Sequence, residues 1–129
     1  MRKERPVNLN LTTIKFPITA IVSILHRLSG LFLIAMLPFG LWIFEYAMRS
    51  EANFNYWVTN FMHSFWGGFL LWLFFIGFVY HLVAGVRHLL MDLGWGESLR
   101  GGRIGAGLLV IIWLAVSILL GILLWVGIF

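Results

Sequence analysis

The chain has 129 residues, of which 61% are hydrophobic and only 11% are charged, and its formal net charge is +4. So few charges cannot cover a water-soluble domain, which excludes a soluble enzyme, and basic residues placed beside long apolar stretches indicate membrane topology rather than nucleic-acid binding. The absence of cysteine excludes disulfides, thiolate zinc sites and cysteine-bound iron–sulfur clusters within this sequence, so any redox centre here must use histidine.

Residues 1–17 form a polar and basic segment with Arg2, Lys3, Arg5 and Lys15. Such a segment can lie against lipid headgroups but cannot enter the hydrocarbon, so it is expected to be cytoplasmic or interfacial. No cleavable signal peptide is expected, because this segment precedes the first long apolar run and no small-residue cleavage site follows closely.

The rest of the chain, residues 18–129, is predicted to be one membrane domain with spans at 18–46, 63–91 and 104–129. Pro17 suits the first turn of the first helix, and Pro38 is expected to kink it. Residues 49–60 are predicted to be a polar connection, and residues 93–103 a glycine-rich turn. The fold class is therefore an all-α integral membrane protein with three transmembrane helices.

The basic residues also predict the orientation. Four lie in the N-terminal segment, Arg100 and Arg103 follow the second span, and only Arg49 lies between the first two spans. Because cytoplasmic loops carry the excess of Lys and Arg, the N-terminus should be cytoplasmic and the C-terminus should lie on the opposite side.

Five residues of the second span fall in one narrow stripe, because steps of four and three residues return to nearly the same direction on a helix. They are Gly77, His81, Gly85, His88 and Asp92. An axial heme ligand needs an imidazole that projects from a helix between small residues, which makes His81 a candidate. Alternatively, the glycines serve helix contact and the histidine hydrogen-bonds a neighbour. His63 is expected to be a wetted polar residue near the interface.

The first span carries a second polar face, formed by Ser23, His26, Arg27 and Gly30. A guanidinium at membrane depth needs an anionic or polar partner, so Arg27 is a candidate for binding heme propionates or a quinone carbonyl. The alternative is that Arg27 snorkels to the headgroups. For Arg87 and Asp92 the alternative is pairing with solvent or with loop residues, in contacts that contribute little.

Two segments together resemble the cytochrome b subunit family of succinate dehydrogenase. They are RPVNLNLTTIKFPITAIVSILHRLSG at residues 5–30 and HLVAGVRHLLMD at residues 81–92. The motifs SILHRLSG and HxxxGxRHxxxD within them fall at the expected ends of the expected spans, and the resemblance covers nearly the whole chain. The chain is similar to the larger of the two membrane anchors in that family.

The resemblance implies a subunit of succinate:ubiquinone oxidoreductase that has no complete active site alone and belongs to a heteromeric helix bundle in a bacterial inner membrane. It implies a heme b shared with a second small anchor subunit, and ubiquinone as substrate. FAD and iron–sulfur clusters would belong only to the flavoprotein and iron–sulfur partners. The C-terminus would then be periplasmic, and no nucleic acid is expected as a partner.

Residue by residue, the resemblance implies that His81 is one axial heme ligand, and that Ser23 and Arg27 line the quinone pocket. It places His26, Arg27 and His88 near the heme and its propionates, and it makes Asp92 a candidate for a proton path.

Three other functions stay open from the sequence. A fumarate reductase-type anchor would run the reverse reaction with a menaquinol, although the HRLSG motif favours succinate oxidation. A purely structural anchor would bind no cofactor. A self-contained diheme cytochrome would need paired histidines at two depths, and the whole supply is His26, His63, His81 and His88.

Overall fold

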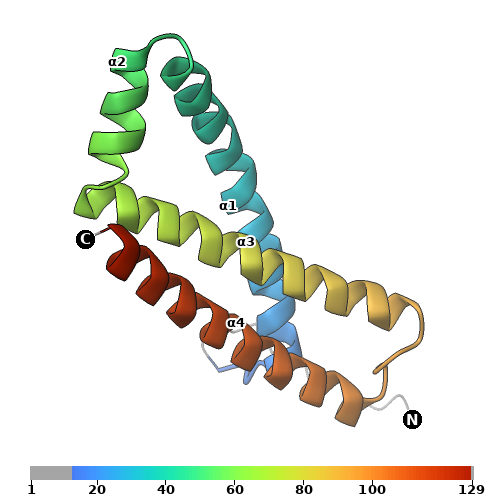
Figure 1. Ribbon diagram of the computed structural model, residues 1–129. Helices are drawn as coiled ribbons and strands as arrows, with labels where there is room; N and C mark the ends of the chain where they lie inside the picture. The colour runs from blue at the N-terminus through green and yellow to red at the C-terminus, as the bar shows by residue number, and fades with distance from the viewer. Residues whose placement is uncertain (1–12, 129) are drawn as a thin grey trace, which may run out of the picture.

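The computed structural model describes residues 13–128, and over this range the chain forms helices and no strand (Figure 1). The long helices are α1 (Ile18–Ala47), α3 (Phe65–Asp92) and α4 (Leu99–Ile128). Each is long and apolar enough to cross a membrane, which confirms the predicted all-α fold with three transmembrane helices. Most of the predicted N-terminal segment, including Arg2, Lys3 and Arg5, lies outside the described residues, as does Phe129.

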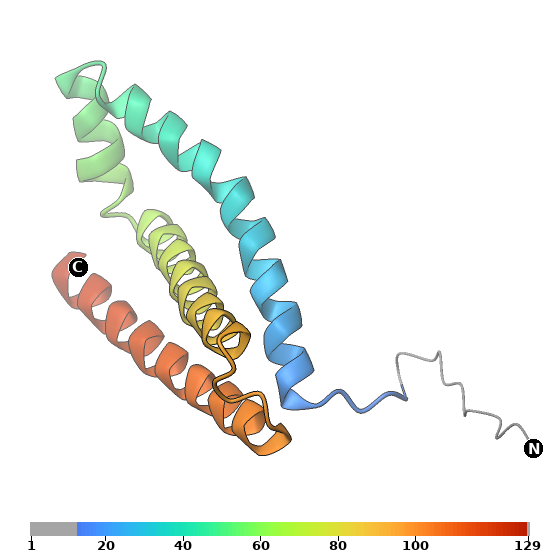
Figure 2. The same ribbon diagram turned by 90° about the vertical axis from the view of Figure 1, so that its right-hand side faces the viewer.

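The helices are arranged so that the two ends of the bundle differ. Helices α3 and α4 run side by side in opposite directions, and α1 crosses them (Figures 1 and 2). The start of α1 and the α3–α4 turn lie at one end, whereas the α1–α3 connection and the end of α4 lie at the other (Figure 2). The basic residues Lys15, Arg100 and Arg103 are therefore gathered at the first end.

The α3–α4 turn is shorter than the sequence indicated. Helix α4 begins at Leu99, because the Ser98 hydroxyl oxygen accepts a hydrogen bond of 3.0 Å from the Gly101 backbone N–H and so caps the helix. Arg100 and Arg103 consequently lie in the first turns of α4 and not in a loop. Gly94 and Gly96 make the reversal with φ angles of +87° and +79°, which side chains rarely adopt.

The connection between α1 and α3 is helical, although the sequence predicted only a polar connection. It consists of α2 (Glu51–Phe54) and a π-helical turn, η1 (Asn55–Phe61). The Ser50 side chain starts α2 by accepting from the Asn53 backbone N–H at 3.2 Å. Arg49, at this end, forms an exposed ion pair of 2.7 Å with Glu45, one turn earlier in α1.

The three long helices are tied together by aromatic donors that bond to backbone carbonyls of a neighbouring helix. The Tyr80 hydroxyl donates to the Val22 carbonyl, the Trp113 indole to Ile76 and the Trp72 indole to Ser117, each at 2.9 Å. Each carbonyl has a second lone pair to offer, and no water competes for it within a bilayer. Around Tyr80, side chains of all three helices form the buried cluster: Val22, Tyr80, Ala84, Ala106 and Leu109.

Gly67 provides a test of the tight turn between η1 and α3. A Cβ at this buried position would overlap the Phe61 carbonyl and lie 2.9 Å from the Met62 Cα, and backbone cannot rotate away. We expect Gly67→Ala to destabilise the protein by about 1–3 kcal/mol, measured as a lower midpoint of thermal unfolding of the detergent-purified complex. Gly107→Ala is the control, because a Cβ there meets nothing within 4 Å. Equal midpoints for both variants would contradict the expectation.

Candidate functional site

Three histidines from α1 and α3 gather near the crossing of these helices. The imidazole of His26 stacks on that of His81, with ring centroids 4.3 Å apart and an angle of 24° between the planes. The same ring lies 5.1 Å from that of His88, tilted by 36°. All three side chains are half-buried, and the Nε2 atom of His26 is buried without a hydrogen-bond partner. The structure therefore brings together three of the sequence-predicted site residues.

The Nδ1 atom of His81 is held by α1. It lies 3.2 Å from the His26 backbone carbonyl oxygen and 3.1 Å from the Ser29 hydroxyl oxygen. A carbonyl can only accept, so this geometry requires the proton of the neutral imidazole on Nδ1. The lone pair is then on Nε2, which is the ring nitrogen that could coordinate a metal ion. Ser29 was not among the site residues predicted from the sequence, although it is part of the SILHRLSG motif.

The glycines of the stripe on the second span face side chains of α1. A Cβ at Gly77 would lie 2.9 Å from the Phe32 ring, and one at Gly85 would lie 3.5 Å from His26 Nε2. Both glycines thus accommodate side chains of α1, which agrees with the helix-contact alternative. The glycine that makes room for the His81 ring is on the opposite helix: a Cβ at Gly30 would lie 3.1 Å from His81 Cε1.

Ser23 and Arg27 lie beside this cluster and not in it. Consecutive helical residues point about 100° apart, so when His26 faces α3, Arg27 is turned away from it. Its side chain is exposed, and that of Ser23 is half-buried. Of the polar face formed by Ser23, His26, Arg27 and Gly30, the part at His26 and Gly30 lies against α3, and Arg27 lies at its exposed edge. Any ligand of Arg27 would lie on the flank of α1.

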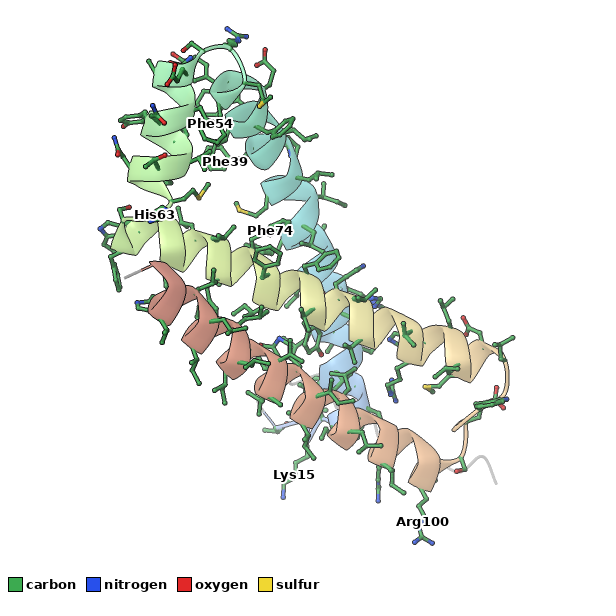
Figure 3. The ribbon with its side chains drawn as sticks, in the orientation of Figure 1. Lys15, Phe39, Phe54, His63, Phe74 and Arg100 are labelled. Carbon is green, nitrogen blue, oxygen red and sulfur yellow. The ribbon has the colours of Figure 1, made fainter. Side chains whose placement is uncertain are left out.

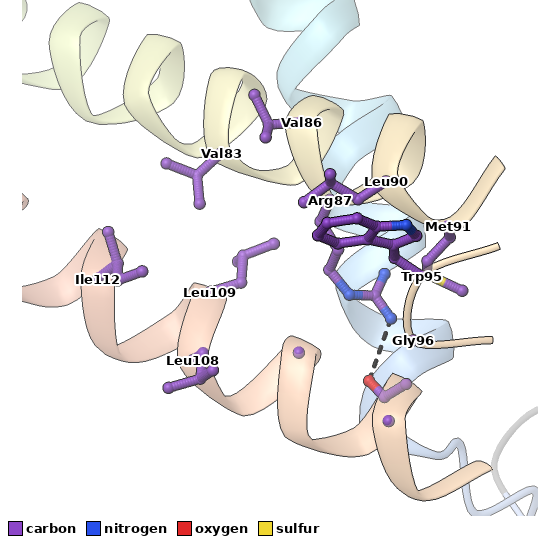
Figure 4. A pocket seen from close by; sticks show the side chains of 13 residues that line it. Val83, Val86, Arg87, Leu90, Met91, Trp95, Gly96, Leu108, Leu109 and Ile112 are labelled. Atoms are coloured by element: carbon purple, nitrogen blue, oxygen red, sulfur yellow. Dashed lines mark hydrogen bonds between the residues drawn. The ribbon is translucent and has the colours of Figure 1, made fainter. Parts of the chain in front are cut away.

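Arg87 turns towards α4, away from the histidines. Its Nη2 donates to the Gly102 carbonyl at 3.1 Å, and Gly105 lets the guanidinium lie against the helix, since a Cβ there would be 3.4 Å from Nε. Figure 4 shows Arg87 and Trp95 at one end of a largely apolar cavity of about 390 Å³ between α3 and α4. Because Gly102 belongs to α4, this contact joins the end of α3 to the start of α4. Asp92 is exposed at the last position of α3.

His63 is far from the other histidines in the described structure. It is exposed in the turn before α3, at the end of the bundle opposite to Lys15 and Arg100 (Figure 3). This exposure is compatible with the prediction of a wetted polar residue near the interface.

The donors fit one axial contact to a heme iron and do not fit two. His81 offers an unprotonated Nε2, but its ring is in stacking contact with that of His26, so no porphyrin can lie between them with one imidazole on each face. Within residues 13–128, no three His, Cys, Asp or Glu side chains gather as a metal site. A heme bound through His81 would therefore not have His26 as its second ligand.

The sequence matches known proteins over nearly its whole length. Residues 1–124 match the family model described as succinate dehydrogenase/fumarate reductase transmembrane subunit. The succinate dehydrogenase cytochrome b556 subunit of Coxiella burnetii is 37% identical, covering 97% of this chain and 100% of that protein. The corresponding subunit of Rickettsia typhi is 33% identical, covering 95% and 92%. The succinate dehydrogenase cytochrome b560 subunit of Marchantia polymorpha is 36% identical, covering 74% and 72%. The chain therefore belongs to the succinate dehydrogenase/fumarate reductase transmembrane subunit family, as a multi-pass membrane subunit of the succinate dehydrogenase cytochrome b type.

Proposed function

We propose that this chain anchors a succinate:ubiquinone oxidoreductase in the bacterial inner membrane, holds one face of a heme b through His81, and contributes Ser23 and Arg27 to the site of ubiquinone reduction. The second axial ligand comes from another small anchor subunit. Succinate is oxidised by a flavoprotein and an iron–sulfur partner, which carry the FAD and the iron–sulfur clusters. The chain has no complete active site alone.

The observation that carries the heme assignment is the contact of 3.2 Å between His81 Nδ1 and the His26 backbone carbonyl oxygen. Because Nδ1 donates to the His26 carbonyl, Nε2 is free to coordinate iron, and a histidine ligand whose other nitrogen donates to a carbonyl is the usual arrangement at metal sites. When bound, the heme supplies a one-electron carrier. The names of the relatives as cytochrome b556 and b560 subunits support the same assignment.

The quinone assignment rests on the chemistry of two side chains one turn apart on α1. Reduction of a quinone builds negative charge on a carbonyl oxygen, and a guanidinium and a hydroxyl can both donate to that oxygen. Arg27 is exposed on the flank of α1, so a quinone there would be enclosed by partner subunits as well as by this chain. In this proposal His26 and His88 lie near the heme and its propionates, and Asp92 belongs to a proton path.

The direct test of the proposed function is spectroscopy on the complex purified through a tag on this chain. We expect the flavoprotein, the iron–sulfur protein and a second small membrane protein to copurify, and the dithionite-reduced minus oxidised spectrum to show b-type bands. Copurification of these partners without b-type bands would support the purely structural anchor instead. Faster fumarate reduction by menaquinol than succinate oxidation with ubiquinone would favour the fumarate reductase alternative.

The orientation prediction is tested with reporter fusions. The N-terminus and the α3–α4 turn are expected in the cytoplasm, because Lys15, Arg100 and Arg103 lie at their end of the bundle, and the C-terminus is expected in the periplasm. Alkaline phosphatase fused to the C-terminus should be active, and the same enzyme inserted after Gly96 should be inactive. The reverse pattern of activities would show that the bundle is inserted in the other direction.

A further inference from the structure

The hydroxyl of Ser29 occupies the point where α1 meets the Nδ1 side of His81. It donates to the His26 carbonyl oxygen at 2.7 Å, three residues earlier in α1, and lies 3.1 Å from His81 Nδ1. With its own proton directed at the carbonyl, the Ser29 oxygen accepts from the Nδ1–H group. That N–H group is therefore shared between two acceptors, the Ser29 hydroxyl and the His26 carbonyl.

This arrangement holds the imidazole from three directions. The Ser29 hydroxyl and the His26 carbonyl hold its Nδ1 edge, Gly30 leaves just enough room for Cε1, and the His26 ring covers one face. A hydroxyl that donates becomes a better acceptor, so the bond from Ser29 to the carbonyl strengthens the bond that Ser29 accepts from Nδ1. Neither contact involves Nε2.

We propose, resting on the proposed heme ligation by His81, that Ser29 is a positioning residue that orients the His81 imidazole and increases the electron density at Nε2. A hydrogen bond donated by the distal ring nitrogen raises the basicity of a histidine ligand. A more basic ligand stabilises ferric iron more than ferrous iron, because the ferric ion carries the larger charge. Ser29 therefore lowers the midpoint potential of the heme.

The test is the midpoint potential of the heme in the purified complex, measured by redox titration of its absorption, together with the EPR signal of the ferric heme. Ser29→Ala should raise the potential, because Nδ1–H then has only one acceptor. A fall of about tenfold in the ratio of ferric to ferrous affinity would shift the potential by about 59 mV for a one-electron couple. The ferric g values should also change, since the ring is less restrained.

Two further variants separate this role from packing. Ser29→Thr keeps the hydroxyl and should restore the parental potential and EPR signal. Ser117→Ala removes a buried hydroxyl of α4 that has no hydrogen-bond partner, and it should leave both unchanged. If Ser29→Ala loses heme entirely, retention of heme with the parental potential in Ser29→Thr still supports the proposal. Loss of heme in both variants would overturn it, as would a parental potential and EPR signal in Ser29→Ala.

Failure of this inference is distinguishable from failure of the proposed function. If His81→Ala abolishes the b-type bands while Ser29→Ala keeps the parental potential, His81 is the ligand and Ser29 does not position it. If His81→Ala keeps the parental bands, the heme assignment itself is wrong and the proposal for Ser29 fails with it.

Discussion

Replacing His81 with alanine should remove the b-type absorption from the purified complex. The variant loses Nε2 of His81 as a ligand. His26 is not expected to replace it, because the His26 ring lies beside the position of the His81 ring, stacked on it, and projects from a different helix. Insertion of the three spans depends on apolar length and not on this imidazole, so the subunit should remain in the membrane. The measurement is the dithionite-reduced minus oxidised spectrum, normalised to the amount of flavin.

His63→Ala is the matched control, since this histidine is exposed at the opposite end of the bundle. Its spectrum should be indistinguishable from that of the parent. A normal bis-histidine spectrum in the His81 variant would mean that another residue ligates the iron, and the contacts of His81 would then be a feature of helix packing alone.

Replacing Arg27 with leucine should slow ubiquinone reduction by at least about tenfold, which corresponds to about 1.4 kcal/mol of transition-state stabilisation. Charge develops on the quinone oxygen during reduction, so a guanidinium stabilises the transition state more than the bound oxidised substrate. Ser23→Ala should have a smaller effect in the same direction, because it removes a neutral donor only. The rate of succinate-dependent ubiquinone reduction by the purified complex measures both.

The control for assembly is succinate oxidation with an artificial acceptor that takes electrons from the soluble subunits, which should keep its parental rate. The control for loss of a positive charge is Arg49→Leu, which should keep the parental rate of ubiquinone reduction. Arg49 is an exposed arginine just after the far end of α1, where it is paired with Glu45. If assembled Arg27 and Ser23 variants reduce ubiquinone at the parental rate and affinity, these residues do not form the quinone site. Arg27 would then be a side chain that extends to headgroups or to a propionate.

The sequence predicted the membrane fold because apolar length alone selects a spanning helix. Each span is an uncharged or nearly uncharged apolar run that is long enough to cross the hydrocarbon of a bilayer. The helix ends were less predictable where a local hydrogen bond decides them. The glycines near residue 101 suggested a longer turn, whereas the Ser98 side chain starts α4 at Leu99. Ser98 itself was the available signal, because serine is a preferred N-cap residue.

The candidate site was predictable as a set of residues but not as a set of contacts. Helical spacing places His81 and His88 on one face of α3, yet it carries no information on the rotation of α1 against that face. That rotation brings His26, Ser29 and Gly30 to His81 and turns Arg27 aside. Spacing also could not show that the side chains of Phe32 and His26 lie against Gly77 and Gly85. Such contacts depend on the crossing of two helices, which a single sequence does not specify.

The aromatic and polar contacts around His81 have a consequence for biogenesis. Every group that orients this imidazole belongs to α1 or α3, and the Tyr80 hydroxyl one residue earlier also bonds to α1. The loss of rotational freedom of the side chain therefore occurs when these two helices pack within a single polypeptide. In the proposed heme site, which this chain would share with a second subunit, the arriving cofactor would meet one ligand that is already oriented, so binding would require less ordering of side chains.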